Sequence, residues 1–164
     1  MKNEEYSLIC EYSFWISVRP LQSGMKPINI IFVDDHPLIR KAWAFILKHD
    51  PRFKLMAACE SGEEAIEKCR ELCPDVVIMD IRLKGISGIE ATKLINQNCP
   101  GTKIIGLSFH SQADSAQEII ENGAMGYLTK LANPEEIFKA ILDVHQGKTY
   151  ICREMAGKLV IAPF

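Results

Sequence analysis

The sequence lacks any apolar run long enough to cross a membrane, since no segment reaches the roughly 18 residues that a spanning helix needs. It also lacks a secretory signal at its start. Glu4 and Glu5 precede a partly apolar stretch that Glu11 interrupts, whereas a signal begins with positive charge and continues as an unbroken apolar core. We therefore expect no membrane association, and we treat residues 1–24 as an N-terminal extension that is disordered or loosely packed.

The cysteines lack the paired spacing of a zinc site. Of the six, Cys69 and Cys73 stand four residues apart and could share a helix face, but no histidine lies near them in sequence. Thiols without such partners are usually small core residues in a reducing compartment. We interpret the cysteines as reduced core thiols of a cytoplasmic protein.

An excess of positive charge is absent as well. The formal net charge is −2, which argues against a nucleic-acid-binding surface spread over the whole domain but leaves room for a local basic patch. Hydrophobic residues make up 48% and charged residues 24%, the balance of an ordinary globular protein. The 164 residues are enough for one domain with a full core.

Five β-rich apolar runs alternate with five helical patterns from Met25 onward. The runs predict strands over residues 27–33, 53–59, 75–80, 103–107 and 125–129. The first helix should begin at Pro37, and the fourth should begin between Ser111 and Asp114 and end at Gly123. The other three begin with a capping residue and a glutamate three positions later: Ser61 and Glu64, Ser87 and Glu90, and Asn133 and Glu136.

This alternation predicts a doubly wound α/β fold with a five-stranded parallel sheet. Strand–helix–strand units pair their strands in parallel through right-handed crossovers. Residues 25–148 contain all of these elements and form one expected domain. A last short helix is also predicted over about residues 153–161.

The stretch from Asp75 to Asp80 is the centre of the predicted sheet. Its four consecutive apolar residues are typical of a strand buried on both faces, and it ends on a carboxylate. Open α/β sheets bind their ligands beyond the carboxyl ends of the strands. Asp80 is therefore a candidate functional acid, although taken alone it could simply turn the chain.

Polar residues at the other strand ends strengthen that interpretation. Asp34 and Asp35 follow the first strand, Ser108 the fourth and Lys130 the fifth, and parallel strands bring these ends to one edge. Clustered carboxylates repel one another, and Mg²⁺ is the divalent cation that their hard oxygens suit. A lysine and a hydroxyl beside that metal would receive a phosphoryl group, which a carboxylate can accept covalently. Each residue alone could equally be a helix-end charge, a turn hydroxyl or a solvated lysine.

The motifs at these strand ends resemble one known family. Residues 26–148 are similar to the receiver domain of bacterial two-component response regulators. The residues of the motifs are most like those of the NarL/FixJ (LuxR-type output) subfamily. The matching segments are Val33-Asp34-Asp35-His36-Pro37, Met79-Asp80-Ile81-Arg82-Leu83, Gly88, Leu107-Ser108 and Gly126-Tyr127-Leu128-Thr129-Lys130. The resemblance implies a flavodoxin-like (CheY-like) (βα)5 fold with strand order 2-1-3-4-5.

The resemblance also implies a role for each acidic residue. Asp80 would be the phosphoacceptor, and Asp34 and Asp35 would hold Mg²⁺ together with Asp80 and the backbone carbonyl of Arg82. Leu131 follows Lys130 at a position where many members of the family have proline, so a cis peptide bond there would cost more.

Three further residues take implied roles in phosphate contact and switching. Lys130 and Ser108 would contact the phosphoryl oxygens. Tyr127 would be the switch aromatic, whose ring moves inward when Ser108 is drawn to the phosphate. Arg82 and His110 stand two residues beyond Asp80 and Ser108, at positions that tune phosphate lifetime in the family.

The expected function is that of a phosphorylation-controlled switch rather than an enzyme, with at most self-phosphorylation and self-dephosphorylation. Its expected partner is a sensor histidine kinase, with homodimerisation on phosphorylation. DNA would be reached only through an output domain that this chain has no room for, and residues 149–164 resemble the start of a linker to one. The alternatives are a stand-alone receiver that acts through protein partners, or a phosphatase or phosphotransferase. Such an enzyme often has a second acid where Arg82 stands.

Overall fold

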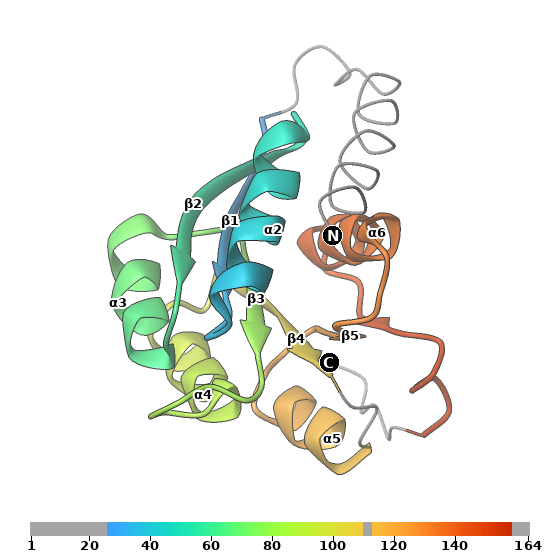
Figure 1. Ribbon diagram of the computed structural model, residues 1–164. Coiled ribbons are helices and arrows are strands. Elements are labelled where there is room, and N and C mark those ends of the chain that lie inside the picture. The colour runs from blue at the N-terminus through green and yellow to red at the C-terminus, as the bar shows by residue number, and fades with distance from the viewer. Residues whose placement is uncertain (1–25, 110–112, 159–164) are drawn as a thin grey trace.

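A computed structural model describes residues 26–109 and 113–158. Its centre is a parallel sheet with strand order β2-β1-β3-β4-β5-β6 (Figure 1). The strands are β1 (Ile28–Val33), β2 (Phe53–Cys59), β3 (Val76–Asp80), β4 (Lys103–Ser108), β5 (Gly126–Thr129) and β6 (Tyr150–Ile151). The helices are α2 (Pro37–His49), α3 (Gly62–Leu72), α4 (Gly88–Asn98), α5 (Ala113–Glu121) and α6 (Pro134–His145).

The predicted doubly wound fold and the order of its five strands are confirmed. Helices α2 and α6 cover one face of the sheet, and α3, α4 and α5 cover the other (Figure 1). All five residues of β3 are buried, as expected for a strand covered on both faces. The continuous apolar run therefore marks the middle of the sheet, with β1 on one side and β4 on the other.

The sheet has one strand more than the sequence predicts. Tyr150–Ile151 pairs in parallel with β5, and the Tyr150 amide donates to the Met125 carbonyl at 3.0 Å. Residues 153–158 form turns instead of the predicted helix, and the rest of that helix lies outside the described residues. Cys152 and Met155 are buried, so this segment covers the edge that β5 would otherwise expose.

The three predicted helix caps are confirmed. Ser61, Ser87 and Asn133 accept hydrogen bonds from backbone amides three residues ahead, at 3.2, 3.1 and 2.8 Å. Each cap satisfies an amide that has no partner within its helix, which fixes where the helix begins. Ser111 lies outside the described residues.

The cysteines agree only in part with the prediction of core thiols. Cys59, Cys69 and Cys152 are buried and free. Cys73 is exposed because it caps the end of α3, with a left-handed φ of 47°. Among the described residues, no helix combines the length and apolar character needed to cross a membrane.

Candidate functional site

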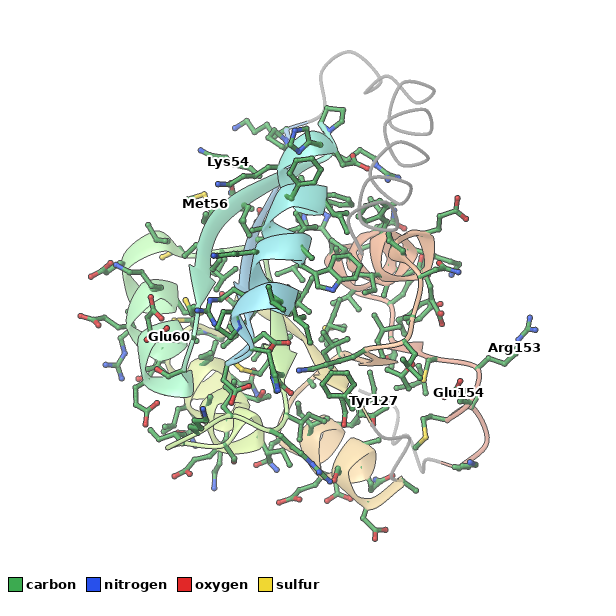
Figure 2. The ribbon with its side chains drawn as sticks, viewed as in Figure 1. Lys54, Met56, Glu60, Tyr127, Arg153 and Glu154 are labelled. Atoms are coloured by element: carbon green, nitrogen blue, oxygen red, sulfur yellow. The ribbon has the colours of Figure 1, made fainter. Side chains whose placement is uncertain are left out.

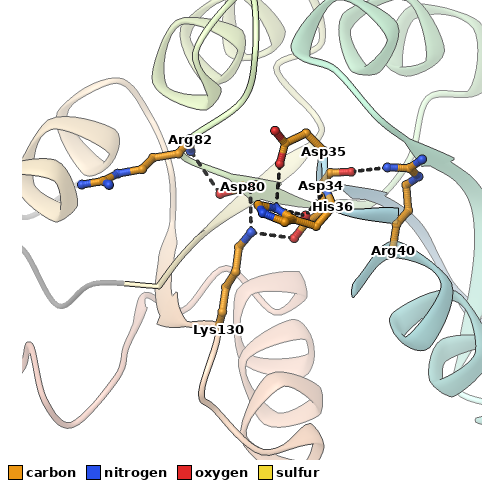
Figure 3. Close-up of polar contacts among 7 residues, drawn as sticks. All are labelled: Asp34, Asp35, His36, Arg40, Asp80, Arg82 and Lys130. Carbon is orange, nitrogen blue, oxygen red and sulfur yellow. Dashed lines mark hydrogen bonds and ion pairs between the residues drawn. The ribbon is translucent and has the colours of Figure 1, made fainter. Parts of the chain in front are cut away.

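Three charged side chains from different strands meet at the carboxyl edge of the sheet (Figure 3). Lys130, which follows β5, places its Nζ 2.7 Å from Oδ2 of Asp34 and 2.7 Å from Oδ2 of Asp80. The three side chains are at most 3% exposed. The structure thus brings the predicted phosphoacceptor, one predicted metal ligand and the predicted lysine into direct contact.

The carboxylates form a group that fits a hard divalent cation. One ligand atom from each of Asp34, Asp35, His36 and Asp80 lies within 4.8 Å of the others. Within the described chain, buried Oδ2 of Asp34 and Oδ1 of Asp35 accept no hydrogen bond, although Lys130 and His36 nitrogens lie 2.7 and 2.8 Å from them. Carboxylate oxygens grouped in this way are the ligands that Mg²⁺ prefers. His36 was not among the residues predicted for the site, although it stands beside Asp35.

The loop after β1 is held by contacts that present Asp34 to the cluster. Oδ1 of Asp34 accepts a hydrogen bond from the His36 amide at 2.8 Å. The Arg40 guanidinium donates to the Asp34 carbonyl at 2.6 Å (Figure 3). It also pairs with Glu60 at 3.2 Å. Arg40 lies one helical turn inside α2, and no sequence pattern pointed to it.

The end of β3 is held tightly against the start of α4. A Cβ on Gly88 would lie 1.9 Å from the Asp80 carbonyl oxygen, so only glycine allows this approach. The Gly88 amide donates to the Ile81 carbonyl at 3.0 Å. The Arg82 amide donates to Oδ1 of Asp80 at 3.0 Å, while its side chain points away from the carboxylates (Figure 3). The metal-ligand role of the Arg82 carbonyl stays a prediction.

Burial raises the pKa of Asp80 above its ordinary value. The hydrogen bond and charge of Lys130 and the Arg82 amide oppose this rise, whereas the neighbouring Asp34 adds to it. A buried carboxylate is costly to ionise, and a positive group placed beside it favours the charged form. A bound cation would favour the ionised form of Asp80 for the same reason.

Ser108 and Tyr127 lie side by side next to this cluster. Ser108 ends β4 and is 3% exposed, and Tyr127 on β5 is fully buried. Burial raises the pKa of Tyr127, and a hydrogen bond with the Ser108 side chain opposes the rise. Figure 2 shows Tyr127 inside the molecule, whereas the Arg153 side chain projects outward. The switch role of this pair stays a prediction, and the ring is already in an inward position.

One further residue at the site was not predicted from the sequence. Phe109 follows Ser108, and the Lys130 ammonium lies 4.7 Å from the centre of its ring. The same ring meets the His36 ring edge to face, with 6.0 Å between the centroids. The next residue, His110, lies outside the described residues.

Comparison with known proteins agrees with this geometry. Residues 30–142 match the response regulator receiver domain. The chain is 36% identical over 135 residues to the response regulator UvrY of Escherichia coli K12, covering 82% of this chain and 62% of UvrY. It is 35% identical over 133 residues to the transcriptional regulatory protein LnrK of Bacillus subtilis, covering 81% and 60% of the two chains.

Solved structures give the same result. The crystal structure of a LuxR-family two-component response regulator from Aurantimonas superposes with a TM-score of 0.77 at 32% identity, covering 81% of this chain and 95% of that one. The receiver domain of the response regulator NarL from Mycobacterium tuberculosis gives 0.73 at 26% identity, covering 76% and 100%. The chain spans about three-fifths of the length of the curated relatives. It belongs to the response regulator receiver domain family.

Proposed function

We propose that Asp80 accepts a phosphoryl group and that the chain works as a Mg²⁺-dependent switch. The observation that carries this proposal is the position of Lys130, whose buried ammonium contacts both Asp34 and Asp80. Two buried carboxylates beside a lysine suit a group that arrives with negative charge, because metal and ammonium can then both contact it.

The chain's own residues would divide the transfer between them. An Asp80 oxygen bonds to phosphorus as the phosphorus–nitrogen bond of a kinase phosphohistidine breaks, and the bonding pair returns to the imidazole. Lys130 and Ser108 would contact the phosphoryl oxygens. Mg²⁺ held by Asp34, Asp35, Asp80 and the Arg82 carbonyl would offset the charge that gathers between the oxygens.

The consequence of phosphorylation would be a shift between two packings of the same domain. The Ser108 hydroxyl would exchange its contact with Tyr127 for one with the phosphoryl group, which changes the packing around α5, β5 and α6. We infer a sensor histidine kinase as donor, a homodimer as the phosphorylated form and the cytoplasm as the location. The chain would not act as an enzyme on external substrates.

The wider role we propose is control of transcription. Support comes from the relatives, since LnrK of Bacillus subtilis and DegU of Brevibacillus brevis are named transcriptional regulatory proteins. Receivers of this kind act on DNA through an output domain. Residues 149–164 would lead towards such a domain.

The test is binding of beryllofluoride, a phosphoryl analogue, by wild type and Asp80→Asn with and without Mg²⁺. We expect Mg²⁺-dependent binding by wild type and none by the variant. Asp143→Asn is the matched control, since this carboxylate lies near the end of α6 and pairs with Lys139, not with Lys130. Equal binding by Asp80→Asn, or multiple-turnover hydrolysis of an external phosphate ester, would overturn the proposal. Phosphotransfer from a histidine kinase completes the test.

A further inference from the structure

Phe109 is a large apolar side chain held at the pocket by polar neighbours. It is 45% exposed, although it directly follows the buried Ser108. The Lys130 ammonium lies 4.7 Å from the centre of the Phe109 ring, and the His36 ring meets the same ring edge to face. A cation beside a ring face and an aromatic edge on a ring are both attractive arrangements. These contacts fix the ring against Lys130 and His36.

The strand order places this ring and the His36 ring on either side of the end of β3. Phe109 follows β4, whereas His36 follows β1, and β3 lies between those two strands. Neighbouring strands are about 4.8 Å apart, so two rings that start beside β1 and β4 and meet must together span the end of β3. Asp80 is the residue at that end. It is 2% exposed, which agrees with a cover above it.

We propose that Phe109 is the cover of Asp80 and limits the access of water to the phosphoryl group on it. This inference rests on the proposed phosphorylation of Asp80. In hydrolysis the water oxygen bonds to phosphorus while the bond from phosphorus to the Asp80 oxygen breaks. The bonding pair returns to the carboxylate, the water gives up a proton to solvent, and inorganic phosphate leaves. The attacking water must approach from the side opposite the Asp80 oxygen, beyond the carboxyl end of β3.

The ring has no polar atom, so it can act only by excluding water and by positioning Lys130. Its removal should therefore change the lifetime of the phosphoryl group more than the affinity for Mg²⁺, whose ligands are the carboxylates. The ring should also shield the Lys130 amine, whose side chain is 3% exposed. This second effect does not depend on phosphorylation.

The experiment compares wild type, Phe109→Ala, Phe109→Tyr and Phe45→Ala. Phe45 is the matched control because it is also a phenylalanine with 45% exposure, but it lies on α2 and stacks on His49. Each protein is phosphorylated with acetyl phosphate and Mg²⁺, and the loss of the phosphoryl group is followed after the donor is removed. In parallel, each unphosphorylated protein is treated with acetic anhydride, and acetylation of Lys130 is measured by mass spectrometry.

We expect Phe109→Ala to lose the phosphoryl group several-fold faster and to acetylate Lys130 several-fold faster, with unchanged Mg²⁺ affinity. Phe109→Tyr keeps the ring and should restore both rates, and Phe45→Ala should match wild type. If Phe109→Ala loses the phosphoryl group and acetylates Lys130 at the wild-type rates, the proposal that the Phe109 ring covers Asp80 is wrong. A wild type that takes no phosphoryl group would instead overturn the proposed function, and the acetylation arm alone would then decide whether the ring covers the pocket.

Discussion

The ammonium of Lys130 lies 2.7 Å from Oδ2 of Asp80, and each of the two side chains is only 3% exposed. The same ammonium lies 2.7 Å from Oδ2 of Asp34, so one cation serves two buried carboxylates. Breaking a buried pair by removing one partner is costly, because the remaining charge is left without compensation. Lys130 is therefore expected to stabilise the fold as well as to contact a phosphoryl group.

We predict that Lys130→Met lowers the free energy of unfolding by about 3 kcal/mol at neutral pH. Added Mg²⁺ should recover part of the loss, because it supplies the missing positive charge. Lys139→Met is the control, since the Lys139 side chain is 64% exposed and ion pairs of such exposed groups contribute little to stability. Urea unfolding of both variants, with and without Mg²⁺, measures the loss of stability and its recovery. Equal losses in the two variants would contradict the prediction.

The raised pKa of Asp80 predicts a stability that falls as pH rises. Between the ordinary aspartate value, about 4, and the raised value, the folded protein binds more protons than the unfolded chain. Each further rise in pH within that window favours unfolding. In Asp80→Asn the Lys130 ammonium still pairs with Asp34, so no buried charge is left alone. The variant should therefore be more stable than wild type at neutral pH, and the difference should shrink as pH falls towards 4. Urea unfolding without divalent cations at a series of pH values tests this, and a pH-independent difference would contradict it.

Gly88→Ala should be strongly destabilising. The added Cβ would lie 1.9 Å from the Asp80 carbonyl oxygen and 2.9 Å from the Ile81 Cα, and both are backbone atoms that cannot simply rotate away. The end of β3 and the start of α4 must separate, at an expected cost of about 3 kcal/mol.

The displacement caused by Gly88→Ala should also weaken Mg²⁺ binding, because Asp80 moves with its backbone. Gly101→Ala is the control, since among the described residues no heavy atom outside Gly101 and its two chain neighbours lies within 4 Å of the added Cβ. This variant should change stability by less than about 0.5 kcal/mol. Thermal unfolding and Mg²⁺ titration measure the two effects. Similar behaviour of the two alanine variants would show that the close approach at Gly88 is unimportant.

Tyr127 should contribute mainly through its ring. Tyr127→Phe keeps the buried ring and removes the hydrogen bond with Ser108, at an expected cost of about 1 kcal/mol. Tyr127→Ala would leave a cavity in the core and should cost about 4 kcal/mol. Tyr150→Phe should be nearly neutral, because that hydroxyl makes only a long contact of 3.4 Å with Glu136. Chemical denaturation of the three variants separates the contribution of the ring to stability from that of the hydroxyl.

The helix starts and the order of elements could be predicted because they depend on neighbours in sequence. A serine or asparagine with an amide three residues ahead closes its hydrogen bond locally, as Ser61, Ser87 and Asn133 do. The apolar run from Val76 to Met79 likewise needs no distant information to indicate a strand covered on both faces. Strand β6 escaped prediction because two residues, Tyr150 and Ile151, carry no periodic pattern and are ordered only by the edge of β5.

The sequence by itself determined which chemical groups stand at the strand ends. Each of five residues ends or directly follows a predicted strand, and parallel strands must bring such residues to one edge: Asp34, Asp35, Asp80, Ser108 and Lys130. Only the tertiary structure decided how these groups meet. Three contacts join residues from different strands and helices. Two carboxylates share Lys130, Arg40 contacts the Asp34 backbone, and the Phe109 ring contacts Lys130. Their distances depend on how the sheet twists and how side chains pack across it, which no local pattern in the sequence records.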